Sequence, residues 1–248
     1  MFNPRNNSPF GGQRNNRFGA SSYQYQTLPY GSMTGVQAGG LVSKVMALLA
    51  TSFLVATIGA FIGVSIHMGF GGYLVVVIGG FVALIALQMM INRQGLNLFL
   101  LFLFTFLEGL GLAPLIGAYL ASGAGYILGE AFLITAGTAA GLSIYAWTTK
   151  RSFARIGDYL FFGLILLLVA GLVGFFFHST FFTLIIAMFG VAIFSGYVLY
   201  YVQRAKYMAD TLPNAIGLTV SLFLTLMNLF IYILEILSIL QGGNRGRR

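Results

Sequence analysis

Residues 158–177 read DYLFFGLILLLVAGLVGFFF, an apolar run whose only charged residue stands at its first position. A helix of about 20 residues spans about 30 Å, which is the thickness of the hydrocarbon core of a bilayer. Charged residues make up 7% of the chain and apolar residues 58%, whereas a soluble domain carries about 25% charged residues. Comparable runs recur at 41–66, 73–91, 96–121, 126–148, 180–203 and 212–240. The sequence therefore predicts an all-α membrane protein, a seven-transmembrane-helix bundle over 41–240.

Two segments of different composition flank this bundle. Residues 1–38 are rich in Asn, Gly, Ser, Gln and Arg, and contain no apolar core of the length that a signal peptide needs. Such a segment buries too little apolar surface to offset the entropy of ordering, so we expect a disordered tail. The tail is either a passive tether or a handle for a partner. Residues 241–248 form a short basic carboxyl-terminal tail.

The net charge of +8 is distributed unevenly along the chain. The loops that follow the first, third and fifth runs carry no Lys or Arg, and the opposite loops and the amino-terminal tail carry most of them. Cytosolic loops collect Lys and Arg, so this pattern predicts a cytosolic amino terminus and explains the charge without nucleic acid. The absence of a targeting sequence fits a bacterial inner membrane. Seven spans place the carboxyl terminus outside, although Arg245, Arg247 and Arg248 favour the inside.

Small residues recur at intervals of four in three of the predicted spans. This spacing lets helix backbones approach closely in lipid, so it predicts helix-packing faces. The residues concerned are Gly59 and Gly63, then Gly109, Ala113, Gly117 and Ala121, and finally Gly137 and Gly141.

Only five acidic residues are present, and Glu108 lies in the middle of the run 96–121. A carboxylate inside a membrane span usually faces a cavity or a partner. Glu108 therefore either belongs to a polar pathway or is a neutral group that forms a hydrogen bond to a neighbouring helix. Asp158 and Asp210 fall at helix ends, where we expect solvated partners for Arg155 or Arg204.

The last run carries polar residues on one helical face. These residues either form hydrogen bonds between helices or line a polar pathway, because a polar stripe must turn away from lipid. They are Asn214, Ser221, Thr225, Asn228, Tyr232 and Glu235. Together with the acids of earlier spans, the candidate intramembrane ion pathway comprises Glu108, Glu130, Asn228 and Glu235.

The sequence shows no recognisable catalytic or metal-binding pattern. Cysteine is absent, and the two histidines, His67 and His178, lie in outer loops without a carboxylate neighbour. We found no nucleophile with a base and no phosphate-binding loop. The sequence therefore predicts a protein that is not an enzyme, without a cofactor or a metal site.

The end of the chain resembles a known family. Residues 194–203 (FSGYVLYYVQ) and 220–230 (VSLFLTLMNLF) resemble the closing signature of the Bax inhibitor-1/YccA family. Shorter matches occur in the same order as in the family: 56–59 (ATIG), 129–132 (GEAF) and 149–153 (TKRSF).

The resemblance implies a seven-helix fold with a cytosolic amino terminus, and it implies two kinds of function. Some members act as pH-sensitive calcium leaks, whose sensor is a pair of hydrogen-bonded aspartates. The positions that match the pair are Tyr201 and Thr225, which do not titrate as coupled carboxyl groups do. Bacterial members of the YccA kind associate with a membrane-anchored ATP-dependent protease of the FtsH type and modulate it.

Two functions therefore remain open. The first is a regulatory membrane protein that modulates such a protease or another membrane partner, and the second is a calcium or cation leak without the di-aspartyl sensor. Membrane lipids are expected partners in both.

Overall fold

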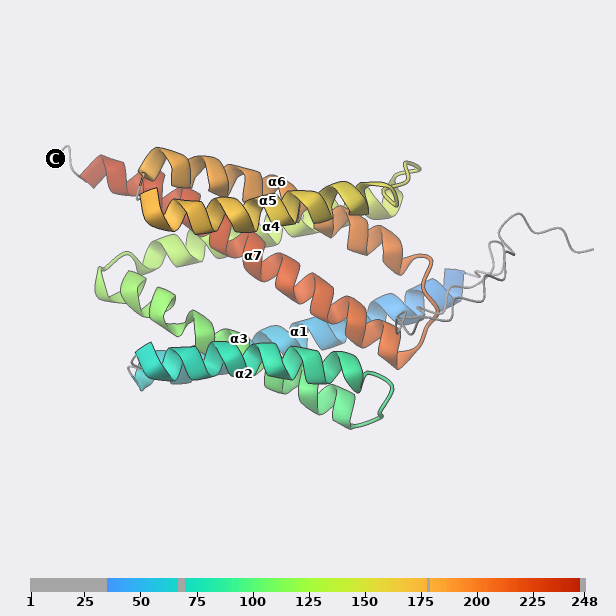
Figure 1. Ribbon diagram of the computed structural model, residues 1–248. Helices are drawn as coiled ribbons and strands as arrows, with labels where there is room; N and C mark the ends of the chain where they lie inside the picture. Colours follow the sequence, from blue (N-terminus) through green and yellow to red (C-terminus); the bar gives the residue numbers. More distant parts are fainter. Residues whose placement is uncertain (1–34, 67–69, 178, 246–248) are drawn as a thin grey trace, which may run out of the picture.

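The computed structural model describes residues 35–66, 70–177 and 179–245. These residues fold as seven α-helices, all long and apolar enough to cross a membrane (Figure 1). The predicted fold class is thus confirmed. The helices are α1 (Gly35–Ser65), α2 (Phe70–Met89), α3 (Leu96–Ala121), α4 (Gly125–Thr148), α5 (Ile156–Phe177), α6 (Thr180–Ala205) and α7 (Leu212–Arg245).

The first and the last helix extend further into the flanking segments than the sequence indicated. Helix α1 starts at Gly35, inside the segment predicted to be a disordered tail, and α7 continues to Arg245, inside the predicted basic tail. The prediction of disorder for residues 1–34 lies outside the described residues, as do the last three residues of the basic tail.

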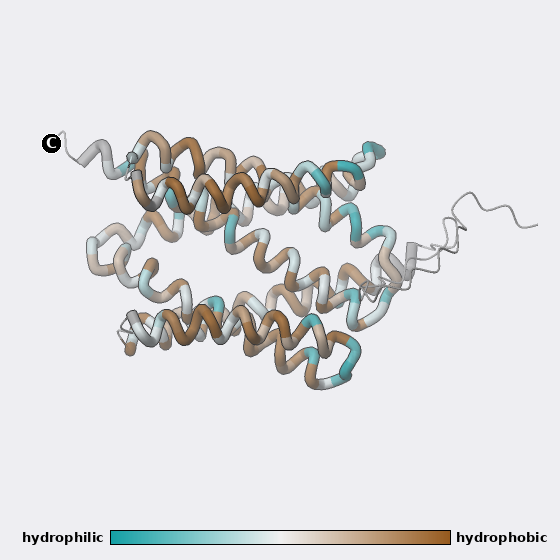
Figure 2. The backbone as a smooth tube through the Cα atoms, in the orientation of Figure 1, coloured by the Kyte–Doolittle hydropathy of each residue, from teal (hydrophilic) through white to brown (hydrophobic). Residues whose placement is uncertain are grey.

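The polar parts of the chain gather at one end of the bundle. The start of α1 and the α2–α3, α4–α5 and α6–α7 connections lie together at the right of Figure 1, and the end of α7 lies at the opposite side. Hydrophilic residues are concentrated at the same right-hand end in Figure 2. We call it the basic end, because Arg93, Lys150, Arg151, Arg204 and Lys206 lie in or beside its connections.

Helices α1 and α3 approach each other at their glycines. A Cβ atom on Gly109 would overlap the backbone carbonyl of Ala56, and one on Gly59 would overlap the carbonyl of Phe106. A Cβ atom on Gly63 would overlap the Cβ atom of Ala113 and come within 3.2 Å of the Leu110 carbonyl. Direct backbone contact of this kind gives van der Waals packing between helices that hydrophobicity alone does not bring together in lipid. The predicted packing face on these two helices is confirmed.

The packing role predicted for three other glycines was wrong. A Cβ atom on Gly117, Gly137 or Gly141 would meet no atom within 4 Å among the described residues. Gly117 follows Pro114, which removes a backbone hydrogen bond inside α3, and the last turns of α3 lie away from α2 in Figure 1. Helix α4 packs on α6 and α7 through residues other than its glycines.

Helix α7 is the centre of the bundle and α5 is its periphery. Helix α7 packs on α1, α4 and α6, and the Phe223 ring lies 5.1 Å from Phe53 of α1 and 6.1 Å from Phe104 of α3, between ring centroids. On the other side, Gly190 of α6 leaves room for the ring of Tyr232. Helix α5 packs chiefly on α6 and is the least buried of the seven spans.

Candidate functional site

Three of the polar residues of α7 form hydrogen bonds within their own helix, and the Asn214 amide donates to the Ala209 carbonyl in the α6–α7 connection. The Ser221 hydroxyl donates to the Gly217 carbonyl at 3.0 Å, the Thr225 hydroxyl to Ser221 at 2.7 Å, and the Asn228 amide to Leu224 at 2.8 Å. Bonds of this type to the preceding turn are an ordinary alternative for Ser and Thr in membrane helices. These three hydrogen bonds therefore do not join α7 to another helix. They also give each of the three side chains a partner without a polar pathway.

The four residues of the candidate ion pathway come from three helices and are spread along the bundle. Glu108 is half-buried and lies against α2, since a Cβ atom on Gly80 would come within 3.6 Å of its Oε1. Glu130 is exposed near the start of α4, where its Oε2 accepts a hydrogen bond of 2.5 Å from Gln241 Nε2 at the far end of α7. No hydrogen bond among the described residues joins any two of the four, Asn228 and Glu235 included, so the pathway stays a prediction.

The two positions that match the aspartate pair are held by other contacts. The Tyr201 ring stacks on Tyr197 at 5.6 Å between centroids and meets Tyr200 edge-on at 5.3 Å. Thr225 is buried and bonded to Ser221 as described above. An aromatic cluster on α6 therefore occupies the region where a carboxyl group would have to ionise.

An ion pair at the basic end connects α1 to the α6–α7 connection. The Lys44 ammonium lies 2.9 Å from Asp210 Oδ1, in the α6–α7 connection, and Gly40 leaves room for the same carboxylate. The sequence suggested Arg155 or Arg204 as partners of the acids at helix ends, because these residues are near the acids in the chain. Lys44 lies 166 positions from Asp210, so the sequence does not indicate this pair.

The end of α6 holds the end of α4 and the loop that follows it. Lys206 Nζ donates to the carbonyls of Ala146, at 2.7 Å, and Trp147, and it lies 5.2 Å from the centre of the Trp147 ring. Burial lowers the pKa of the Lys206 amino group, and the two carbonyls and the indole face compensate its charged form. Gln203 Nε2 donates to the Arg151 carbonyl at 2.6 Å, and its Oε1 accepts from the Phe153 amide.

Sequence reasoning missed this contact set. A lysine and a glutamine that follow an apolar run look like residues that face water, and only the tertiary structure shows which carbonyls they reach. The side chains act as caps for α4, whose last carbonyl groups have no partner within the helix.

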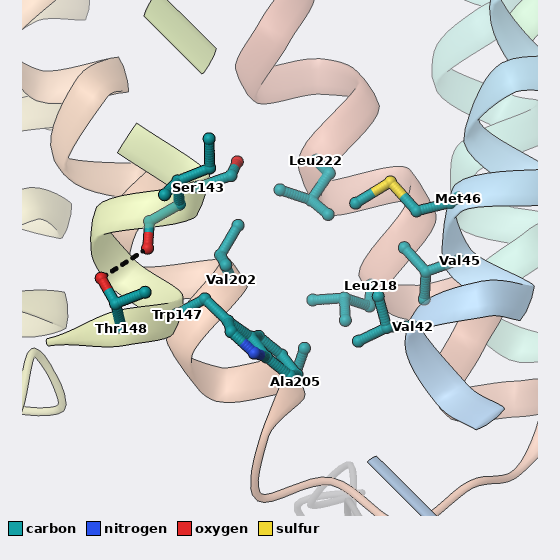
Figure 3. A pocket seen from close by; sticks show the side chains of 11 residues that line it. Val42, Val45, Met46, Ser143, Trp147, Thr148, Val202, Ala205, Leu218 and Leu222 are labelled. Atoms are coloured by element: carbon teal, nitrogen blue, oxygen red, sulfur yellow. Dashed lines mark hydrogen bonds between the residues drawn. The ribbon is translucent and has the colours of Figure 1, made fainter. Parts of the chain in front are cut away.

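Two apolar cavities lie between α1 and α4, which make no extensive contact with each other. The cavity nearer the basic end has a volume of about 270 Å³, with Val42 and Met46 of α1 facing Trp147 of α4 over Leu218 of α7 (Figure 3). The deeper cavity, of about 420 Å³, also reaches α3. Its lining includes Phe53 and Ala60 of α1, Ala136 and Ala139 of α4, and Leu226 and Phe230 of α7.

Fold and interior together define a multi-pass α-helical membrane protein whose interior is mainly apolar. The sequence pattern of the family described as "Inhibitor of apoptosis-promoting Bax1" matches residues 39–242, so that it covers nearly all of the seven helices. The chain belongs to this family, and the resemblance drawn from its motifs is confirmed.

Relatives come from bacteria, animals and viruses. An uncharacterized protein of Campylobacter jejuni is 37% identical over 205 residues, which cover 79% of this chain and 87% of the relative. Protein lifeguard 4 of the mouse is 31% identical over 64% of this chain and 65% of its own length. The Golgi anti-apoptotic protein of vaccinia virus is 29% identical, with 62% and 63% covered.

Proposed function

We propose that the protein is a regulatory membrane protein that acts by binding another membrane protein within the bilayer. The observation that carries this proposal is the position of α5, which packs chiefly on α6 and leaves most of its surface outside the bundle. Large apolar side chains cover that surface, for example Phe162 at 65% and Leu166 at 69% exposure. A helix held on one side only offers a long face to a transmembrane helix of a partner.

The partner that best fits is a membrane-anchored ATP-dependent protease of the FtsH type. The family resemblance implies it, and the bacterial relatives support a bacterial inner membrane as the location. The basic end supports a cytosolic amino terminus, because Lys and Arg collect on the cytosolic side. The replacement of the aspartate pair by Tyr201 and Thr225 favours this function over a pH-gated leak.

Crosslinking within the membrane tests this function. A photo-reactive amino acid in place of Leu166, on the outer face of α5, should form a covalent adduct with the protease in native membranes. The same amino acid in place of Leu167, which is 5% exposed on the inner side of α5, is the matched control and should not. Equal adducts at both positions, or an unchanged turnover of protease substrates when the gene is deleted, would contradict the proposal.

A calcium or cation leak is the second candidate, and the position of Glu108 favours it. This acid is half-buried inside α3, opposite a glycine of α2, and has no hydrogen-bond partner among the described residues. If Glu108 carries the flux, Glu108→Gln should abolish calcium flux into liposomes, because the titratable group is lost at constant size. Asp158→Asn is the control, since Asp158 is exposed at the start of α5 and lies outside the candidate pathway. Unchanged flux with Glu108→Gln rejects this role.

A further inference from the structure

The two cavities between α1 and α4 are consecutive parts of one groove. On α1 the lining advances from Val42 in the first cavity to Ala60 in the second, while on α4 it moves back from Trp147 to Phe132. Helix α7 supplies the floor of both. Because three helices contribute in register, we treat the two cavities as a single α1–α4 groove.

The length of the groove matches one leaflet of a bilayer. Along α7 its floor extends from Leu218 to Phe230, which is about 18 Å at the helical rise of 1.5 Å per residue. Half of the hydrocarbon core of a bilayer is about 15 Å. One end of the groove lies at the basic end, beside Trp147, a residue type that prefers the interface between hydrocarbon and head groups.

The walls of the groove suit a hydrocarbon occupant and not a polar one. Its lining is almost entirely aliphatic and aromatic. The hydroxyl groups of the deeper part are already bonded within their helices, Thr57 to the Phe53 carbonyl and Thr135 to the Ala131 carbonyl, at 2.8 and 2.7 Å. An occupant therefore needs no hydrogen-bonding group along this length.

The mouth of the groove, in contrast, carries a cation. Lys206 lies over Trp147 on the α4 side, whereas Lys44 of α1 does not line the groove and is paired with Asp210. Lys206 uses two of its three N–H groups for carbonyls of α4, which leaves one for a further acceptor. An apolar channel of leaflet length with an ammonium group at its interfacial end complements a lipid with a negatively charged head.

We propose that the α1–α4 groove binds a phospholipid, with one acyl chain along α7 and the phosphate at Lys206. The lipid would fill the space between two helices that hardly touch, so it would act as a structural ligand of the bundle. This site is separate from the outer face of α5 and does not depend on the partner proposed above.

The experiment uses the full-length protein, purified in mild detergent and analysed by native mass spectrometry. The wild type should retain one adduct with the mass of a phospholipid. Ala139→Phe fills the deeper part of the groove and should reduce retention about tenfold, as filling a packed site does. Ala140→Phe is the matched control, because the neighbouring alanine is exposed and lies outside the groove, and it should retain the lipid.

A second measurement does not depend on the stability of these variants. Trp147 is the only tryptophan of the chain, so its fluorescence reports on the mouth of the groove. A phosphatidylglycerol with bromine on the upper part of its chains, diluted in phosphatidylcholine nanodiscs, should quench Trp147 more strongly in the wild type and Ala140→Phe than in Ala139→Phe. Equal quenching in all three, no retained adduct, or an adduct with the mass of a fatty acid would each overturn the proposal.

Discussion

Two glycines on α3 that look alike in the sequence differ in what surrounds them. We expect Gly109→Ala to destabilise the bundle by about 1–3 kcal/mol, because the new methyl group would overlap the carbonyl of Ala56 and force α1 and α3 apart. Gly117→Ala should leave the unfolding free energy unchanged or raise it by up to about 1 kcal/mol, since a Cβ atom there meets open space and alanine favours a helix over glycine. Unfolding in mixed micelles with increasing denaturing detergent measures both, and an equal loss for the two variants would contradict this assignment.

The same two glycines show what a spacing of four predicts about helix packing and what it does not predict. The interval places Gly109, Ala113 and Gly117 on one helical face, and this face was identified correctly up to Ala113. Whether a neighbouring helix covers the face depends on where α3 bends after Pro114 and where α1 ends. Neither is contained in the local pattern, so the pattern alone does not distinguish Gly117 from Gly109.

At the scale of elements, Gln203 fixes the loop between α4 and α5. Replacing it by leucine leaves the Phe153 amide and the Arg151 carbonyl without their partner, at a cost of about 1–3 kcal/mol. We expect Gln203→Leu to loosen this loop, so that trypsin cleaves faster after Lys150 and Arg151. Gln94→Leu, in the α2–α3 connection, is the control and should leave cleavage of the α4–α5 loop unchanged. A wild-type cleavage rate in Gln203→Leu would show that the loop is held by other contacts.

The helices themselves were predictable, because a long apolar run has no alternative fold in lipid. The span 96–121 was predicted with the same ends as α3, and the other helices differ by a few residues at one or both ends. The sequence places the polar residues of α7 on one helical face, but it does not show which groups they bond. Ser221, Thr225 and Asn228 form hydrogen bonds with the preceding turn, which is an option that a residue list does not distinguish from bonds between helices.

At the scale of the whole molecule, the candidate site could be predicted only as a set of residue types. The scarcity of acids singled out Glu108, Glu130 and Glu235, yet the structure distributes them among α3, α4 and α7. The α1–α4 groove had no signal in the sequence, since its lining consists of the same aliphatic residues that face lipid elsewhere. It arises because α1 and α4 both pack on α7 and hardly on each other, which is a property of the assembled bundle.

The orientation of the whole bundle yields the last prediction. Reporter proteins fused in the α2–α3 connection after Gln94 should be active in the cytosol, and those fused after Gly123 or at the carboxyl terminus should be active outside. The reason is that the connections with Lys and Arg share one end of the bundle, whereas α7 ends at the other (Figure 1).

The terminal arginines need not oppose this arrangement. Helix α7 has 34 residues and is therefore about 50 Å long, which exceeds the hydrocarbon core of about 30 Å. Its last turns, where Gln241 bonds Glu130, can hold Arg245 beyond the membrane. Replacing Arg245, Arg247 and Arg248 by serine should leave all three reporters unchanged. Cytosolic activity at the carboxyl terminus, with the Gly123 fusion still outside, would mean that α7 does not cross the bilayer.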